Sequence, residues 1–359
     1  MKFFKSIKTF IFYVISLIWD VIYRVRRFCY DYGIKRQYSF HVPIISVGNL
    51  TFGGTGKTPF TLWISDYVSR KNKKVMILMR GYKGKLEHSH GLIKSNSKMA
   101  PDPILYGDEA LLYARKLKNA SVVVGKKRAQ NLEYYFSEEK PDLVVLDDGH
   151  QHIKIKRNLN FVLFDLMQPL SIYEVAPLGL MREGMSALKD ADLIVLARAD
   201  LVDEGKKTAL KKLIRPHLAP RTPIAEIRYV PNGLLDTSFK LKMKAQDLKG
   251  KKVICLAGIA SPLSFFKMIE ELGALILITE SFPDHHYFKL EELKSFIDYA
   301  KAEDALIVTT EKDIVRIKQV VDDPVFCFLD IKVDFLKAEE ETMLLIDNLF
   351  LGKTSELVR

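Results

Sequence analysis

The stretch that decides the fold is residues 46–59, which read SVGNLTFGGTGKTP and follow the apolar run Val42–Ile45. A short apolar strand that enters a glycine-rich turn and then a helix is the arrangement with which a P-loop binds phosphate. Glycines let backbone N–H groups point at phosphate oxygens, and the start of the helix attracts negative charge. Pro59 suits the first helical turn, where a missing N–H costs nothing. The stretch therefore predicts a nucleotide-binding loop.

The residues predicted to bind nucleotide are Thr51, Phe52, Gly53, Gly54, Thr55, Gly56, Lys57 and Thr58. Lys57 is expected to reach the outer phosphates, where it would act in catalysis, and the Thr58 hydroxyl is expected to bind Mg²⁺. The usual pattern begins with glycine, and this chain has Thr51 there. A plain structural turn is the alternative, and the glycines that precede Lys57 favour phosphate binding over it.

Composition places the chain among globular proteins. Its 359 residues are 48% hydrophobic and 28% charged, which allows a large core and, by length, two lobes. The net charge of +11 favours an acidic partner, which could be nucleic acid, an anionic membrane surface or a phosphorylated substrate. Three scattered cysteines without a C-x-x-C pair argue against a disulfide framework or a zinc site, and they indicate a reducing compartment.

Residues 9–23, TFIFYVISLIWDVIY, form an apolar run with lysines before it and arginines after it. A helix of this length spans about 22 Å, which is less than the roughly 30 Å of a bilayer core, and Asp20 lies inside it. An interfacial helix with basic flanks that attract anionic lipid fits better. A secretory signal is disfavoured because no small-residue cleavage site follows. The other open alternative is a helix that caps the protein core.

From residue 42 onward, short apolar runs alternate with segments of helical periodicity. Expected strands are 43–47, 74–79, 121–124, 143–146, 161–164 and 193–196, and expected helices include 58–70, 108–117 and 127–136. Such alternation predicts an α/β fold, a mostly parallel sheet with helices on both faces. Ligands of these sheets bind at the carboxyl ends of the strands. The turn-rich, basic segment 83–103 is expected to be mobile.

The pattern changes near Thr222, after which strands are expected at 224–229, 253–257, 274–279, 306–308 and 325–329. Helices are expected between and after them, at 262–272, 290–302 and 338–349. Three parts are predicted: an N-terminal membrane-associated helix with its basic flank (1–40), a P-loop core (41–222) and a second, smaller α/β lobe (223–359) that closes a cleft.

Two acids, Asp147 and Asp148, end the apolar run 143–146, which is the form of a Walker B strand. A carboxylate at that point can hold Mg²⁺ or its water beside Thr58. Acids at a strand end can instead cap the next helix. Gln151 and two histidines, His150 and His152, add an amide and imidazoles at the same edge.

Asp108 and Arg80 also follow expected turns or strands, and each has two open interpretations. Asp108 could cap the helix after it or act in catalysis, and Arg80 could bind phosphate or pair with a core acid. Arg182, next to Glu183, suits bidentate phosphate recognition better than a surface ion pair.

In the second half, Asp284 and His285 lie in a loop where they could orient a general base or contact phosphate. A metal site there is disfavoured because no third ligand follows at helical spacing. The stretch 309–313, TTEKD, is open between helix capping with a buried ion pair and a functional role.

A membrane-binding GTPase-like switch is a competing function class. It would need an N/T-K-x-D motif to recognise guanine, and the nearest stretch, 197–200, reads ARAD. Adenine, and therefore ATP, is favoured. Nucleic-acid binding is the other alternative, but the positive charge is not accompanied by a nucleic-acid motif.

Taken together, the motifs resemble the tetraacyldisaccharide 4′-kinases of lipid A biosynthesis, from the N-terminal helix almost to the C-terminus. The resemblance rests on the residues VGNL at 47–50, GGTGKTP at 53–59, RGY at 80–82, GDE at 107–109, DDGHQH at 147–152, MRE at 181–183, LAGI at 256–259, DH at 284–285 and TEKD at 310–313. That family is similar in lacking the first P-loop glycine. His150 departs from it, because an apolar residue is usual there.

The resemblance implies transfer of the γ-phosphoryl group of ATP to the 4′-hydroxyl of lipid A disaccharide 1-phosphate, with Mg²⁺, at the cytoplasmic face of the inner membrane. It implies that Asp108 is the base and that His285 pairs with it once the cleft closes. It also implies that Arg182 and Glu183 line the nucleotide or metal site. Glu109, Gln151, His152, Arg80 and Asp284 remain further candidate site residues.

Overall fold

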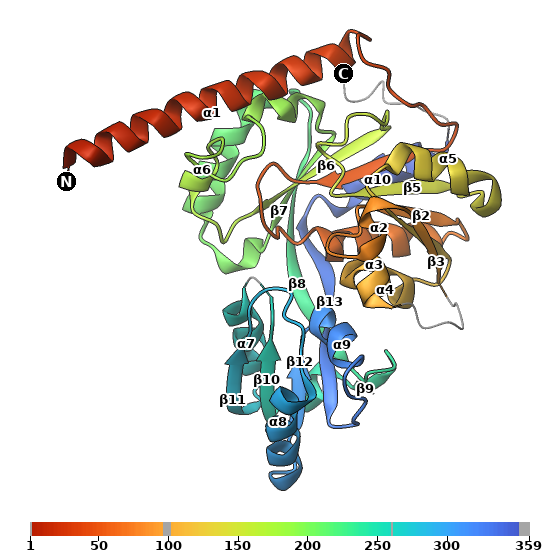
Figure 1. Cartoon of the computed structure of the whole chain (residues 1–359), viewed down its shortest axis with the longest axis vertical. Coiled ribbons are helices and arrows are strands. Elements are labelled where there is room, and N and C mark those ends of the chain that lie inside the picture. Colours follow the sequence, from red (N-terminus) through yellow and green to blue (C-terminus); the bar gives the residue numbers. More distant parts are fainter. Residues whose placement is uncertain (1, 96–101, 260, 352–359) are drawn as a thin grey trace. The chain divides into compact units, whose positions relative to one another are not determined.

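A computed structural model of the chain describes residues 2–95, 102–259 and 261–351, with side chains from residue 9 onward. The chain forms two compact units (Figure 1). Unit 1 comprises Met1–Arg80, Lys127–Arg228 and Val333–Arg359, and unit 2 comprises Gly81–Lys126 and Tyr229–Lys332.

Unit 1 is built on a parallel sheet. Its strands are β1 (Ile44–Gly48), β2 (Val75–Met79), β5 (Leu143–Asp147), β6 (Leu159–Asp165), β7 (Leu193–Ala197) and the first part of β8 (Ile224–Leu235). β1 lies between β5 and β6, β2 pairs with β5, and β7 pairs with β6 and β8. Every residue of the first five strands is buried, as expected for a parallel sheet covered on both faces.

The helices of unit 1 are α1 (Lys2–Asp31), α2 (Lys57–Ser69), α5 (Arg128–Glu139), α6 (Glu204–Ile214) and α10 (Glu339–Asn348). α2 packs against β1, β2 and β5, and α5 packs against β2. α2 therefore begins at the carboxyl end of β1, which is where a P-loop helix must begin.

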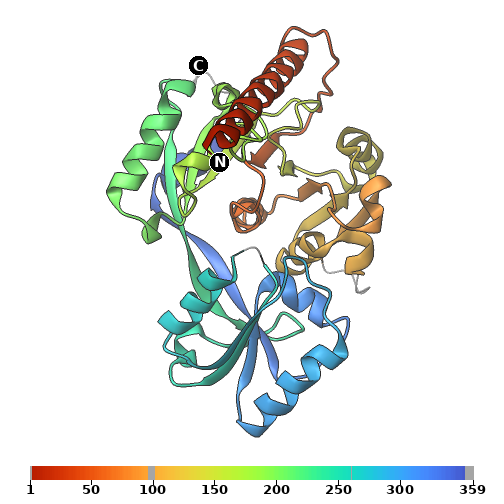
Figure 2. The same cartoon turned by 60° about the vertical axis from the view of Figure 1, so that its left-hand side comes forward.

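α1 runs along unit 1 in both views (Figures 1 and 2). Ser16, Arg27 and Tyr30 are buried, whereas many apolar side chains face solvent. These exposed side chains are Phe10, Ile11, Tyr13, Val14, Ile15, Leu17, Ile18, Trp19, Val21, Ile22, Val25 and Phe28. Among the described residues, no helix has both the length and the apolar character that crossing a membrane requires. The side chains of Lys2, Lys5 and Lys8 lie outside the described residues.

Unit 2 contains a series of parallel strands and one antiparallel strand pair. The sheet order is β11 (Leu275–Ser281), β10 (Lys252–Ala257), β12 (Leu306–Thr309) and β13 (Phe326–Lys337), and β9 (Leu241–Met243) pairs with β8. The antiparallel pair is β3 (Gly91–Lys94) with β4 (Ala120–Val124), and the helices α3 (Pro103–Tyr106) and α4 (Asp108–Lys116) lie between these strands in the sequence. Further helices are α7 (Pro262–Glu271), α8 (Leu290–Ala302) and α9 (Glu311–Ile317).

The predicted α/β fold with mostly parallel strands is confirmed, and the N-terminal helix is present. Three features differ from the expectation. β8 and β13 continue well beyond their apolar runs, β3 and α9 were not expected, and residues 81–126 group with unit 2 although they were expected in the P-loop core. The physical reason for the last difference is that α4 packs on α9, with the partly buried Lys116 paired to Glu311 and Asp330. Of the segment expected to be mobile, residues 96–101 lie outside the described residues.

Candidate active site

The loop between β1 and α2 has the backbone of a phosphate-binding turn. Gly53 and Gly56 have φ angles of 98° and 80°, which favour glycine, and a Cβ at Gly53 or Gly54 would meet nothing within 4 Å. The buried Thr55 Oγ1 finds no hydrogen-bond partner among the described residues. A polar, open loop at the start of a helix is the environment that an anion requires.

Thr51 occupies the position where a P-loop usually has glycine. It forms an antiparallel bridge with Met181, and its hydroxyl accepts a hydrogen bond from Asn49 Nδ2 at 3.3 Å. Because bridged, extended backbone suits any residue, glycine is not needed at this position.

Lys57 is held between two oxygen atoms of unit 1. Its Nζ donates to Asn49 Oδ1 at 3.1 Å and lies 3.2 Å from Asp148 Oδ1. The side chain is 13% exposed, so its charge is available at the mouth of the loop. The lysine that sequence reasoning assigned to phosphate is therefore preorganised by two neighbours, of which Asn49 was not predicted.

The loop that carries Arg182 pairs with the start of the P-loop. The Phe52 N–H donates to Leu180 O at 2.8 Å and the Arg182 N–H to Leu50 O at 2.7 Å. The Arg182 guanidinium lies 5.3 Å from the centroid of the Phe52 ring. It also donates to Asp148 Oδ2 at 2.9 Å. The structure thus brings the predicted Arg182 to the nucleotide loop.

Gln151 joins this group through its amide. Its Nε2 donates to Asn49 O at 2.8 Å, and its Oε1 accepts from Arg182 at 3.3 Å. Asp148, the first residue after β5, has a φ of 49°, and its carboxylate contacts both Lys57 and Arg182. Burial alone would raise the pKa of Asp148, but these two cations lower it far below the ordinary range.

Arg128, the first residue of α5, is a further cation at this site. It is 5% exposed, and it donates to Asp148 O at 2.9 Å. Burial lowers its pKa, and the charges of Asp148 and Asp147 oppose that change, while Arg80 and Arg182 add to it. Arg80, exposed after β2, therefore belongs to the same cationic group.

Asp147 and Glu183 were both predicted as metal ligands, and the structure places them differently. Asp147 ends β5 in register with Val47 of β1, directly before the P-loop. Glu183 is 1% exposed and instead accepts a hydrogen bond from Arg27 Nε at 2.7 Å. Across the described residues, no three His, Cys, Asp or Glu side chains are grouped so that they could hold a metal ion. Thr58 remains at the start of α2, where it was expected.

His150 and His152 are both kept neutral by their surroundings. Burial lowers the pKa of His150 to about 4 and that of His152 to about 3. His150 packs so closely on β1 that a Cβ at Gly48 would lie 2.5 Å from its Cβ. The imidazole of His150 therefore belongs to the packing beneath the site.

Asp108 and His285 are in contact within unit 2. His285 Nδ1 lies 3.3 Å from Asp108 Oδ2, and Arg316 Nε lies 3.0 Å from the same oxygen. The N-cap of α4 is Gly107, and Asp108 is the first helical residue. The interpretation of Asp108 as the helix cap is therefore wrong, because its carboxylate faces a histidine and an arginine instead.

The TEKD stretch supports this contact from α9. Thr310 caps the helix by accepting from Asp313 N at 3.2 Å, and Asp313 accepts from Gly258 N at 2.9 Å. Lys312 pairs with Glu109, which neighbours Asp108. Of the two interpretations left open, the structure supports helix capping with a buried ion pair. Thr310 caps α9, and the buried Asp313 pairs with Arg316.

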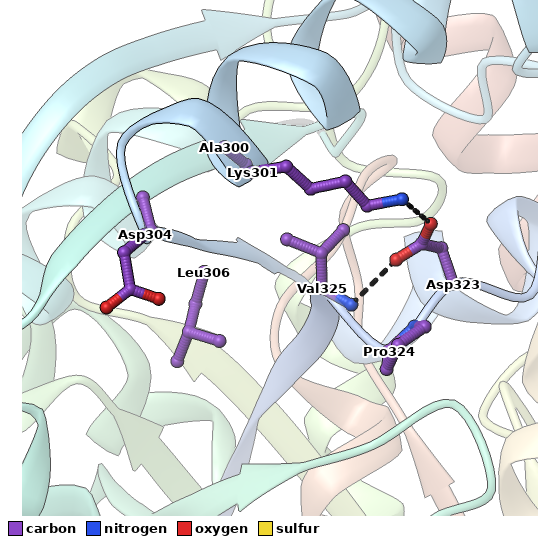
Figure 3. Close-up of a pocket in the computed structure, with 8 residues that line it drawn as sticks. Ala300, Lys301, Asp304, Leu306, Asp323, Pro324 and Val325 are labelled. Carbon is purple, nitrogen blue, oxygen red and sulfur yellow. Dashed lines mark hydrogen bonds and ion pairs between the residues drawn. The ribbon is translucent and has the colours of Figure 1, made fainter.

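Asp284 and a surface hollow near α8 are two further features of unit 2, and neither adds a contact to the Asp108 carboxylate among the described residues. Asp284 is half exposed, with Oδ1 4.0 Å from His285 Nε2. A surface hollow near the end of α8 contains none of the predicted site residues (Figure 3). Its main charged groups, Lys301 and Asp323, pair with each other at 2.6 Å.

Sequence reasoning missed four residues with a direct place in these sites: Asn49, Arg128, Arg316 and Arg27. Asn49 and Arg128 could have been found, since each follows the carboxyl end of an expected strand. The partners of Arg316 and Arg27 are 208 and 156 residues away in the chain, so no local pattern indicates them.

Comparison with known proteins gives one consistent result. A family model described as tetraacyldisaccharide-1-P 4′-kinase matches residues 8–350. The tetraacyldisaccharide 4′-kinase of Anaeromyxobacter sp. (strain Fw109-5) is 33% identical over 312 residues, which is 87% of this chain and 83% of the relative. That of Coxiella burnetii (strain Dugway 5J108-111) is 32% identical over 341 residues, which is 95% of this chain and 92% of the relative.

The fold agrees with a solved structure. The crystal structure of an "apo" form of LpxK from Aquifex aeolicus in complex with ATP is 28% identical to this chain with a TM-score of 0.74. The match covers 94% of this chain and 97% of that structure.

Proposed function

Because this chain belongs to the tetraacyldisaccharide-1-P 4′-kinase family, we propose that it phosphorylates the 4′-hydroxyl of tetraacylated glucosamine disaccharide 1-phosphate with ATP, a step of lipid A biosynthesis. The observation that carries the proposal is the family match across residues 8–350. A P-loop switch without an acceptor substrate is the weaker alternative, because the relatives named above are kinases.

The nucleotide phosphates would bind at the P-loop of unit 1. The unpartnered Thr55 hydroxyl, the open space above Gly53 and Gly54, and the charge of Lys57 support this assignment. Lys57 would balance charge on the phosphoryl group as it is transferred, and the fixed position of the lysine would lower the cost of orienting it. Arg182 would add a second cation at the same place.

Magnesium would be held by Thr58 and one strand-end acid, and it would neutralise negative charge on the phosphates. The donor set fits, because oxygen ligands and waters are what Mg²⁺ prefers. Asp148 contacts a cation through each oxygen, which favours Asp147 for the metal. Glu183 is not favoured as a metal ligand, because its carboxylate already accepts a hydrogen bond from Arg27.

Asp108 would accept the proton of the attacking 4′-hydroxyl, and His285 would orient its carboxylate. Two observations support this assignment. His285 lies 3.3 Å from the Asp108 carboxylate, and Arg316, whose side chain is only 3% exposed, pairs with the same oxygen. A carboxylate fixed by two partners meets the geometric requirement for a general base. Glu109, paired with Lys312, would have no direct role.

The acceptor carries acyl chains, and α1 suits work at a lipid surface. Its exposed apolar side chains and the basic residues that follow it support attachment in the membrane interface rather than across it. We therefore assign the protein to the cytoplasmic leaflet of the inner membrane, where ATP is available.

The assignment is tested by incubating the purified chain with radiolabelled ATP, Mg²⁺ and lipid A disaccharide 1-phosphate in detergent micelles. We expect a labelled bisphosphorylated lipid with the wild type and none with Lys57→Ala. ATP hydrolysis without a labelled lipid would contradict the kinase assignment and favour the switch.

A further inference from the structure

Side chains of α1 contact the turn 148–151 and the loop 182–184, which carry Asp148 and Arg182. Trp19 Nε1 donates to Arg182 O at 2.9 Å, and Arg26 donates to Gln151 O at 3.1 Å. Asp20 Oδ1 accepts from Gly184 N at 3.0 Å. The fit is close, because a Cβ at Gly184 would lie 2.2 Å from that oxygen. α1 is therefore packed onto the backbone of the nucleotide site, in addition to facing solvent.

Arg27 is the most deeply inserted charged residue on the side of α1 that makes these contacts, with 6% exposure. Its Nε donates to Glu183 Oε2 at 2.7 Å, its NH1 to Asp190 Oδ2 at 2.6 Å, and its NH2 lies 3.2 Å from His150 Nε2. All the guanidinium nitrogens thus have partners, which is the condition under which a buried charge is tolerated. Burial alone would lower the pKa of Arg27, but the neighbouring Glu183 carboxylate raises it above its ordinary value.

The partners of Arg27 are next to the residues that hold Lys57. Glu183 follows Arg182, and His150 lies two residues after Asp148. Arg182 and Asp148 pair at 2.9 Å, and Asp148 lies 3.2 Å from Lys57. One side chain of α1 therefore connects the turn 148–151 to the loop 182–183. Asp148 of the turn contacts Lys57, and Arg182 of the loop contacts Asp148.

We propose that Arg27 is a positioning residue for the nucleotide site: through Glu183 and His150 it holds Arg182 and Asp148 in the arrangement that supports Lys57. The helix that would attach the protein to lipid then also completes the site that binds the phosphates. This inference rests on the proposed kinase function where it is tested by kcat, and on the P-loop alone where it is tested by nucleotide binding.

The first test compares Arg27→Met, Arg27→Lys and the control Arg36→Met in detergent micelles, where membrane attachment is not limiting. Arg36 is an exposed cation just after α1, so its variant removes the same charge without touching the site. We expect Arg27→Met to lower kcat by about tenfold or more with little change in the KM for the lipid, as losses of supporting partners do. Arg27→Lys should recover part of the activity, and Arg36→Met should match the wild type.

A double-mutant cycle then separates positioning from a general structural role. If Arg27 acts through Arg182, the Arg27→Met change should cost much less in an Arg182→Met background than in the wild type. The same fold loss in both backgrounds would overturn the proposal, and so would full activity of Arg27→Met. If Arg27→Met does not fold, Glu183→Gln takes its place in the cycle, because it keeps the shape of the side chain. The same comparison with and without Arg182→Met then decides the proposal.

Binding of a fluorescent, non-hydrolysable ATP analogue keeps this test separate from the kinase assignment. We expect the Kd of Arg27→Met for the analogue to rise about tenfold over that of the wild type. A wild type that binds the analogue but phosphorylates no lipid would contradict the proposed function alone. An unchanged Kd together with an unchanged kcat in Arg27→Met would contradict the positioning role alone.

Discussion

The Nζ atom of Lys57 lies 3.2 Å from Oδ1 of Asp148, and Arg182 binds the other oxygen of the same carboxylate at 2.9 Å. Asp148, the first residue after β5, thus fixes two cations at the mouth of the P-loop.

Removing Lys57 should abolish turnover without unfolding the protein. We expect Lys57→Ala to reduce kcat on the order of 10³-fold, because preorganised charge is the main contribution to phosphoryl transfer. The control is Arg70→Ala, which removes a cation that is 77% exposed at the far end of α2. Melting temperatures of both variants check the fold, and a Lys57→Ala enzyme with near-normal rate would remove the P-loop from the mechanism.

Asp108→Asn should reduce kcat about 10²-fold or more and leave the KM for ATP unchanged, since a general base contributes about this much. Glu109→Gln is the matched control, because it neutralises the neighbouring acid, which pairs with Lys312. Steady-state kinetics of both variants are compared at saturating lipid. Equal losses in the two variants would indicate a charge or folding effect in place of base catalysis.

Gly48 and Gly54 should respond in opposite ways to the same added methyl group. Gly48→Ala places a Cβ 2.6 Å from the backbone nitrogen of His150, so we expect it to lower stability by about 1–3 kcal/mol. Gly54→Ala meets nothing within 4 Å and should keep the melting temperature while raising the KM for ATP, because the methyl group enters the space for phosphates. A Gly54→Ala enzyme with unchanged KM would contradict this use of the open space.

Acid should destabilise the protein partly through His150. Its pKa is near 4 in the folded chain and about 6.5 when unfolded, so the unfolded state binds more protons between these values. Stability from this residue is complete above pH 6.5 and is lost as the pH falls toward 4, at up to about 1.4 kcal/mol per pH unit. The free energy of unfolding, measured with urea at several pH values in this range, should depend less steeply on pH in His150→Leu than in the wild type. The exposed His217 is the control, and His217→Gln should retain the wild-type slope.

Exposed apolar residues of α1 should carry membrane attachment. Leu17 and Ile18 are 53% and 55% exposed, so Leu17→Asp with Ile18→Asp should release the protein from anionic vesicles in a sedimentation assay. Leu344→Asp, at an equally exposed leucine of α10, should not. If the double variant still sediments with vesicles, another surface binds the lipid.

Much of unit 1 could be predicted because its strands are short apolar runs that end in turns, as Val75–Met79 does. The far end of β8 could not, because Pro231, Asn232 and Gly233 are residues typical of turns. The far end of β13 could not, because it mixes charged with apolar residues.

The family resemblance led us to expect Asp108 and His285 to pair across a closing cleft, but both residues lie within unit 2, where they are already in contact. The bond from Arg27 to Glu183 was not anticipated, since a buried ion pair between distant residues leaves no periodicity in the chain.

The central claim is tested most directly by determining where the new phosphate is attached. Phosphorus and carbon NMR of the lipid recovered after reaction with ATP and Mg²⁺ would assign it. The account predicts one additional phosphate on the 4′ oxygen of the disaccharide, absent when Lys57→Ala is used. Free phosphate released from ATP with an unmodified lipid, or a phosphate at another position, would contradict it.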